Sequence, residues 1–191
     1  RLREGVERVL VEPSVLPVAP EKLSERLPQE LGHLEQLQRT IEQVVVRPLV
    51  PGNPIEPLID GDAAYPDLLS AIHAARSSVS LATYIFNADV IGERFVAALS
   101  AAKGRGVAVR VLVDDAGARY SWPRITKSLR RAGVPHALFH PRMWLPSSST
   151  FNLRNHRKIC VVDGRIGFTG GINIKRGHVL ADHGGRPVQD L

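Results

Sequence analysis

The sequence predicts an α/β protein built on a mixed, mainly parallel β-sheet with helices on both faces. Amphipathic helical segments alternate with short apolar strands over most of the chain, which is typical of βαβ units. An Asp-Gly pair between the last two apolar runs indicates a hairpin, which adds antiparallel strands. The 191 residues are 43% hydrophobic, enough to bury the core that such a fold needs.

Residues 1–46 differ from the rest of the chain and are expected to form a helical leader. Four leucines recur at the spacing of an amphipathic helix: Leu27, Leu31, Leu34 and Leu37. Basic residues do not dominate the polar face of this helix, so packing on the following domain is favoured over binding to a membrane surface. Residues 47–54 are rich in turn-forming residues, and the main domain is expected over 47–191.

The first elements of the main domain follow from apolar spacing and helix capping. A helix is expected over 65–77, because its apolar residues fall on one face: Leu68, Leu69, Ile72 and Ala75. The apolar run 79–86 is typical of a largely buried strand. Asp89 is a suitable N-cap for a second helix over 89–103, and two glycines after that helix act as stop signals.

The later elements continue the alternation and then end in a hairpin. A strand, a helix and a further strand are expected at 107–113, 122–131 and 134–139. The pattern lapses over 140–155, a loop with prolines and serines that is typical of segments entering a functional site. Asp163-Gly164 then joins two strands, 158–162 and 165–169, as a hairpin.

Two groups of residues have more than one interpretation. Asp114 and Asp115 end a predicted parallel strand, where α/β sheets tend to bind ligands, but a turn or helix cap is favoured for them. Trp122, Met143 and Trp144 either belong to the core or line an apolar channel for acyl chains. The sequence does not separate these two alternatives.

Charge and composition favour an anionic partner. The net charge is +6 and the isoelectric point is about 10.0, which suits nucleic acid, acidic lipid headgroups or a phosphorylated substrate. A single cysteine, Cys160, excludes an intramolecular disulfide and a cysteine-rich metal site, and fits a reducing compartment. No run of about 18 apolar residues occurs, so no transmembrane segment is expected in this chain. Because the first residue is Arg1 rather than Met, we expect a fragment.

Side chains that can hold an anion flank the hairpin. Residues two apart on an extended backbone face the same way, so His156 and Lys158 are expected to point together while Arg157 points away. The hairpin brings the Gly170-Gly171 turn and Asn173 back beside them. An imidazole, an ammonium, a carboxamide and exposed backbone N–H groups would then meet at one phosphate.

This pattern resembles the HKD motif of the phospholipase D superfamily. Five residues fall in register with that motif: His156, Lys158, Asp163, Gly170 and Asn173. Four upstream or overlapping segments are similar to the bacterial cardiolipin synthases of this superfamily: 61–66, 83–86, 106–112 and 152–158. The likeness covers about residues 50–191, and it implies a phospholipase D-like fold for that part of the chain.

The resemblance implies a two-step displacement at phosphorus. His156 would attack to form a phosphohistidine, and the histidine of a second motif would protonate the leaving alcohol. Lys158 and Asn173 would stabilise the equatorial oxygens as charge builds on them. Gly170 and Gly171 would line the phosphate site. Gly171 stands where many members have serine, so backbone N–H groups would replace a hydroxyl contact. No metal and no cofactor are expected.

Two carboxylates complete the expected catalytic set. Asp163 belongs to the motif, but the resemblance gives it a mainly structural role in holding the hairpin, so it ranks below His156 and Lys158. The family places a carboxylate some thirty residues after the histidine, which implies that Asp190 orients the imidazole ring.

The chain contains one motif where the superfamily needs two. No other histidine here is followed two residues later by lysine, including His136, His178 and His183. A second half is therefore expected either from the same longer chain or from an identical chain in a homodimer.

The expected function is phosphatidyl transfer of the cardiolipin synthase type. It would join two molecules of the anionic phospholipid phosphatidylglycerol on the cytoplasmic side of a membrane surface, or hydrolyse phospholipid when water is the acceptor. One alternative is a homodimeric phospholipase D-type phosphodiesterase or nuclease, with nucleic acid the less favoured partner. Another is an inactive half-domain that only binds phosphate.

Overall fold

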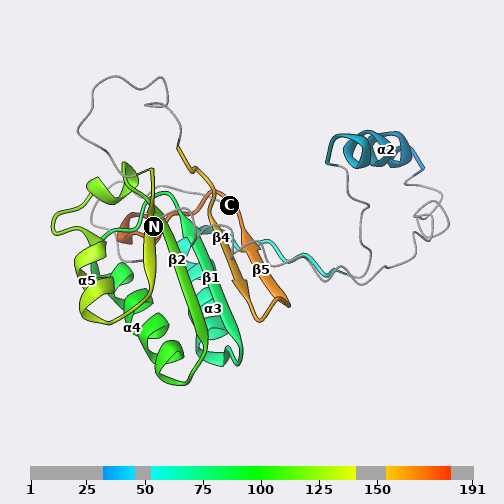
Figure 1. The fold of residues 1–191 in the computed structure, drawn as a ribbon. Coiled ribbons are helices and arrows are strands. Elements are labelled where there is room, and N and C mark those ends of the chain that lie inside the picture. Colours follow the sequence, from blue (N-terminus) through cyan, green and yellow to red (C-terminus); the bar gives the residue numbers. More distant parts are fainter. Residues whose placement is uncertain (1–31, 46–52, 141–153, 182–191) are drawn as a thin grey trace. The chain divides into compact units, whose positions relative to one another are not determined.

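The computed structural model describes residues 32–45, 53–140 and 154–181, and the chain forms two compact units, 1–56 and 57–191. In the first unit the described helix is α2 (Leu34–Val45) (Figure 1). It contains two of the four leucines of the expected leader helix, and the other two lie outside the described residues. Three apolar side chains of α2 are exposed: Leu37, Ile41 and Val44.

The second unit is built on a five-stranded sheet with the order β3-β2-β1-β4-β5. Its strands are β1 (Ser78–Thr83), β2 (Ala108–Asp114), β3 (His136–Phe139), β4 (Ile159–Val162) and β5 (Ile166–Thr169). The β1–β2 and β2–β3 pairs are parallel, because helices cross back between these strands. The β1–β4 and β4–β5 pairs are antiparallel, so the hairpin lies beside the central strand β1.

Three helices accompany the sheet, and two short 3₁₀ turns follow β2 and the hairpin. The helices are α3 (Asp60–Ala74), α4 (Val90–Gly104) and α5 (Ile125–Arg131), and the turns are η3 (Gly117–Arg119) and η4 (Arg176–His178). The Asp89 side chain accepts hydrogen bonds from the Ile91 and Gly92 amides at 3.0 Å, as expected for the N-cap of α4. Helix α5 begins later than predicted, because Arg124 pairs with Asn87 in an isolated β-bridge.

The core lies between the helices and one face of the sheet. Alternate strand residues such as Val79 and Val111 join a single buried cluster with Ile72 of α3, Leu99 of α4 and Leu129 of α5. The next residues along β1 and β2, which point to the second face, include exposed Ser80 and Arg110. Figure 1 looks onto this second face, with α3 behind the strands.

The predicted α/β class with a mixed sheet is confirmed, with two differences in detail. Parallel and antiparallel pairs are equal in number, because β4 pairs with β1 rather than extending the parallel part of the sheet. Helices α3, α4 and α5 all pack on one face, whereas helices were expected on both. Apolar spacing shows that a helix has a buried side, but it does not tell which face of the sheet that side covers.

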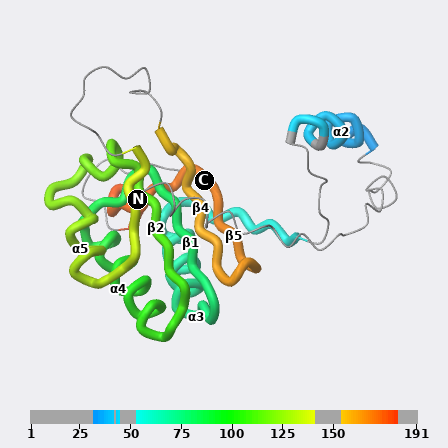
Figure 2. The backbone as a smooth tube through the Cα atoms, in the orientation of Figure 1, coloured from blue at the N-terminus to red at the C-terminus, as the bar shows by residue number. Residues whose placement is uncertain are grey.

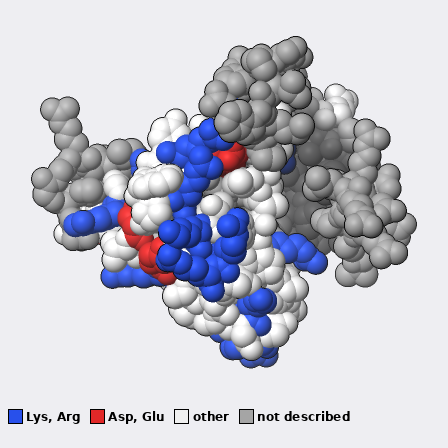
Figure 3. Space-filling view, turned by 60° about the vertical axis from the view of Figure 1, so that its left-hand side comes forward, with Lys and Arg blue, Asp and Glu red and all other residues white. Residues whose placement is uncertain are grey.

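Basic side chains gather on the side of the second unit that carries α5. Figure 3 turns this side forward and shows Lys and Arg side chains close together there. Helix α5 itself carries three exposed basic residues: Lys127, Arg130 and Arg131. Helix α5 packs on α4, where Ser128 Oγ donates a hydrogen bond to Glu93 Oε1 at 2.6 Å.

Candidate active site

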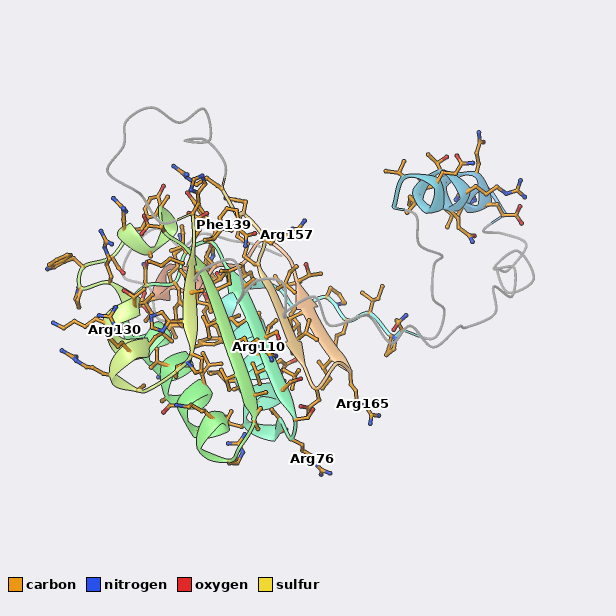
Figure 4. All side chains as sticks on the ribbon, viewed as in Figure 1. Arg76, Arg110, Arg130, Phe139, Arg157 and Arg165 are labelled. Carbon is orange, nitrogen blue, oxygen red and sulfur yellow. The ribbon has the colours of Figure 1, made fainter. Side chains whose placement is uncertain are left out.

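His156 and Lys158 lie at the edge of the sheet where parallel strand β1 ends. Ile159, the first residue of β4, pairs with Ala82 near the end of β1 and with Thr169 at the end of β5. The segments before β4 and after β5 therefore meet at this edge, as Figure 2 shows along the chain trace. In Figure 4 Arg157 marks this edge, and Arg165 lies at the opposite end of the hairpin.

The His156 and Lys158 side chains are in direct contact. Lys158 Nζ lies 2.8 Å from His156 Nδ1 and 2.8 Å from the His156 carbonyl oxygen. The two groups therefore point the same way, as the strand spacing predicts. An ammonium only donates hydrogen bonds, so Nδ1 is the acceptor here and the proton of a neutral ring resides on Nε2. The His156 side chain is exposed, and that of Lys158 is half-buried, so both groups are within reach of an anion at this edge.

Tyr84 forms the wall beside these two groups. Its ring centroid is 4.5 Å from that of His156, and Lys158 Nζ lies 5.6 Å from the Tyr84 centroid. Burial raises the pKa of the Tyr84 hydroxyl, and so do its hydrogen bond to Tyr120 and the negative charge of Asp114. The hydroxyl thus stays protonated, and the ring acts as an uncharged surface against the imidazole.

The sequence does not single out Tyr84 as a site residue, because the apolar run 79–86 predicts a largely buried strand. Strand β1 ends one residue earlier, at Thr83, and the chain then turns so that the Tyr84 ring faces the site. Its place just after the carboxyl end of a parallel strand is the signal that would have marked it, since ligand sites in open α/β sheets lie there.

Asn173 is held by the segment that follows β1. Its side-chain oxygen accepts a hydrogen bond from the Ile85 amide at 3.0 Å. The next residue, Ile174, donates from its amide to the Ile85 carbonyl at 3.0 Å, and its own carbonyl accepts from the Asn87 amide at 2.9 Å. With the oxygen fixed in this way, the donor NH₂ end of the Asn173 amide is left for a ligand.

Tyr65 of α3 supports the same segment from the core. Its side chain is 3% exposed, and its hydroxyl lies 2.6 Å from the Asn173 carbonyl oxygen and 2.9 Å from that of Lys175. Gly170 and Gly171 follow β5 at this edge and are exposed and half-buried respectively. The structure thus brings His156, Lys158 and the glycine turn with Asn173 to one end of the hairpin.

Asp114 ties the His156 segment to the end of β2. Its side chain is 1% exposed, and Oδ1 accepts from the amides of Ala116 and Gly117 at 2.9 and 3.4 Å. The other oxygen, Oδ2, accepts from the Asn155 amide at 2.8 Å. The turn role that the sequence favoured is therefore present. The additional bond to the residue before His156 spans 41 positions of sequence and was not predicted.

Asp163 lies at the other end of β4 and is not part of this site. It accepts hydrogen bonds from the backbone amides of Ser78, Arg76 and Ser77 at 2.8 to 2.9 Å, and from Ser77 Oγ at 2.9 Å. These bonds, led by that from Ser78, hold the pKa of the carboxyl well below its usual range. These contacts agree with the structural role in holding the hairpin that the resemblance implies for Asp163. The full length of β4 separates it from His156, and it fastens the hairpin to the start of β1.

Other predicted residues lie away from the site or outside the description. Asp190, His183, Met143 and Trp144 fall outside the described residues, so the role expected for Asp190 stays a prediction. Trp122 is 91% exposed, which shows that it does not belong to the core. In the described ranges, no three His, Cys, Asp or Glu side chains are close enough to hold a metal ion.

Comparison with known proteins is consistent with this geometry. The family model described as the cardiolipin synthase, PLD-like domain matches residues 68–183, which include the site and its hairpin. The chain is 36% identical over 122 residues to the major cardiolipin synthase ClsA of Bacillus subtilis, covering 64% of this chain and 25% of that protein. It is 39% identical over 127 residues to cardiolipin synthase A of Pseudomonas fluorescens, covering 66% and 26%. The chain thus spans about a quarter of the length of these relatives.

The fold is also similar to that of a solved structure. Nuc from Salmonella typhimurium, a phospholipase D family member, superposes with a TM-score of 0.50 and 22% sequence identity, covering 69% of this chain and 76% of that one. This likeness shows the fold alone. The family match over more than half of the chain shows that the chain belongs to the cardiolipin synthase family of phospholipase D-like domains.

Proposed function

We propose that this chain supplies one half of a phosphatidyl-transfer site in which His156 is the nucleophile and Lys158 and Asn173 hold the phosphate oxygens. The observation that carries the proposal is the 2.8 Å contact between Lys158 Nζ and the His156 ring at the edge where the glycine turn returns. The cardiolipin synthase names of the relatives support phospholipid as the substrate class. The net charge of +6 suits an anionic phospholipid such as phosphatidylglycerol.

The first chemical step forms a bond between His156 Nε2 and phosphorus. Attack needs the Nε2 lone pair, so the ring proton has to reside on Nδ1, and Lys158 has to turn from Nδ1 toward the phosphate. The P–O bond to the glycerol headgroup breaks, and a general acid protonates the leaving oxygen. That acid is assigned to the histidine of a second motif, supplied by a longer chain or by an identical chain.

The second step regenerates the imidazole. The hydroxyl of another phosphatidylglycerol attacks phosphorus, and the P–N bond breaks to give cardiolipin. The proton of that hydroxyl passes to the second-motif histidine, which acted as the general acid in the first step and is now the general base. Water in place of the lipid hydroxyl gives phospholipase D hydrolysis. Lys158 places a positive charge beside the oxygens that gain charge in both transition states, a kind of stabilisation worth about 3 kcal/mol per donor in a dry site.

Association with the cytoplasmic side of a membrane is part of this proposal. The substrate class and the basic charge support it. Among the residues that the structure describes, no helix is long and apolar enough to cross a bilayer. Contact with lipid within this part of the chain would then occur at a surface.

The test is a transfer assay in which the chain is paired with an identical copy and, separately, with the second half of its own protein. Vesicles containing phosphatidylglycerol are supplied, and cardiolipin and glycerol are measured. We expect equal amounts of both products, and about a hundredfold or greater loss in His156→Ala and Lys158→Ala. His73→Ala, on the exposed side of α3, is the matched control and should keep full activity. Equal transfer by the His156→Ala protein would refute the proposal. Cleavage of single-stranded DNA without lipid transfer would point to the nuclease alternative.

A further inference from the structure

The loop between η3 and α5 carries the most exposed aromatic side chain of the described main domain. Trp122 is 91% exposed and Tyr120 is 66% exposed. Two interactions join this loop to the segment just before α4: the Ala88 amide donates to Ser121 Oγ at 3.2 Å, and Asn87 pairs with Arg124 in a β-bridge. The loop is therefore fastened to the domain, although the Trp122 side chain itself projects into solvent.

A second exposed apolar side chain and a basic helix flank this loop. Val90, at the start of α4, is 49% exposed. Helix α5, which follows the loop directly in the chain, presents Lys127, Arg130 and Arg131 to solvent, and Figure 4 shows Arg130 projecting outward from the domain. Figure 3 shows the surrounding surface to be rich in Lys and Arg side chains. Exposed apolar tips beside several cations make a surface suited to anionic headgroups with apolar chains beneath them.

The loop is also connected to the candidate active site. The Tyr120 ring lies 6.3 Å from the Tyr84 ring in an edge-on arrangement, and the Tyr84 ring lies 4.5 Å from the His156 ring. Asp115, the first residue after β2, adds an ion pair to Arg119 at 2.5 Å. The Tyr120 and Tyr84 rings thus connect the Trp122 loop, and any surface bound to it, with the His156 ring.

We propose that Trp122, Val90 and the basic side chains of α5 form a docking surface for an anionic phospholipid bilayer. The idea rests on the proposed function only for the identity of the lipid. Single-stranded nucleic acid also binds to aromatic and basic side chains, but through base stacking along a groove. Val90 has no ring to stack, whereas an aliphatic side chain and a tryptophan both insert at a lipid interface. The observations therefore favour a bilayer.

The docking surface has a direct spectroscopic readout. The chain contains two tryptophans, so Trp144→Phe leaves Trp122 as the sole indole. Its emission should be that of a water-exposed indole, and should move to shorter wavelength when vesicles of phosphatidylglycerol and phosphatidylcholine are added. Lipids brominated near the headgroup should quench it. Vesicles of phosphatidylcholine alone should give little change at physiological salt.

Variants separate the two parts of the surface. Each basic residue near an anionic leaflet strengthens binding by about fivefold, so the triple change K127Q/R130Q/R131Q should weaken vesicle binding about 100-fold. Trp122→Ala should weaken it about tenfold through the loss of an inserted ring. The matched control R76Q/R165Q removes two exposed cations from the opposite edge of the sheet, where Figure 4 labels both, and should bind within about twofold of the parent.

Binding and chemistry are measured apart, so failure of one does not obscure the other. His156→Ala should bind vesicles normally while losing transfer. Trp122→Ala should bind vesicles about tenfold more weakly and still form product from short-chain phosphatidylglycerol dissolved as monomers. If the Trp122 emission shifts with single-stranded DNA or on self-association, but not with anionic vesicles, the docking proposal is overturned. Equal losses in the control and the α5 triple variant would also overturn it. Normal vesicle binding by a wild-type protein that lacks transfer would refute the proposed function and leave the docking surface standing.

Discussion

Asp114→Asn provides a sharp test of how the site is held together. The carboxylate accepts from the turn amides of Ala116 and Gly117 with one oxygen and from the Asn155 amide with the other, and its side chain is almost fully buried. An asparagine keeps one acceptor oxygen, but an NH₂ group replaces the second oxygen. This NH₂ group is a donor and cannot accept the hydrogen bond from the backbone N–H that faces it. The turn amides lie closest along the chain, so we expect the bond to Asn155 to be lost.

The magnitude follows from the type of bond. A hydrogen bond to a charged group contributes about 1.5–3 kcal/mol, and its loss here leaves a donor without its partner. The free energy of unfolding should fall by about 2 kcal/mol, as measured by urea denaturation. Because Asn155 precedes His156, the segment before β4 should also open more often, and transfer activity should fall by more than tenfold although no reacting group is changed.

Hydrogen exchange followed by mass spectrometry locates the effect. Peptides that contain Asn155 should exchange faster in Asp114→Asn. Exchange of peptides from α4 should change only as much as the lower global stability predicts. Asp115→Asn is the matched control, because its carboxylate pairs with the Arg119 and Arg124 side chains rather than with the His156 segment. Unaltered exchange at Asn155 in the Asp114→Asn protein would show that the reasoning about this carboxylate is wrong.

Three further predictions follow from single contacts. The depressed pKa of Asp163 means that its carboxylate stabilises the fold above about pH 4, near the pKa of an unfolded aspartate, and that this stability is lost as the pH falls further. Asp163→Asn should therefore lower the melting temperature at pH 7 and make the melting temperature depend less on pH below pH 4. Parallel curves of melting temperature against pH for the two proteins would contradict this. Tyr84→Leu should slow transfer by about threefold to tenfold, because it removes the ring contact with His156, whereas Tyr84→Phe should transfer at nearly the wild-type rate. Equal transfer rates in the two variants would argue against the contact. Burial raises the pKa of the Cys160 thiol to about 11, so iodoacetamide at pH 8 should not alkylate the thiol until the protein unfolds. Rapid alkylation of the folded chain would be inconsistent with the position of Cys160 in β4.

The sequence predicts the local parts of the fold well, because they depend on near neighbours. The alternation of helices and strands, the Asp89 cap and the Asp163-Gly164 hairpin all come from patterns a few residues long. The shared direction of His156 and Lys158 follows from the two-residue period of an extended chain. Each of these features was therefore accessible without any knowledge of distant contacts.

Long-range choices were not accessible in this way. The pairing of β4 with β1, the packing of three helices on one face and the bond from Asp114 to Asn155 each join segments far apart in the sequence. Periodicity cannot rank such pairings, because many of them bury similar apolar area. The same limit applies to Tyr84: its apolar neighbours predict a longer, largely buried strand, and only the turn after Thr83 reveals its ring beside His156.

The role of His156 as nucleophile can be tested by trapping the covalent intermediate. The protein, assembled as in the transfer assay, is mixed with phosphatidylglycerol, quenched in alkali within a second and digested for mass spectrometry. We expect one acid-labile phosphatidyl adduct on the peptide that contains His156, absent from the His156→Ala protein. An adduct on any other residue, or undiminished transfer in a protein from which no adduct on His156 is recovered, would contradict that role.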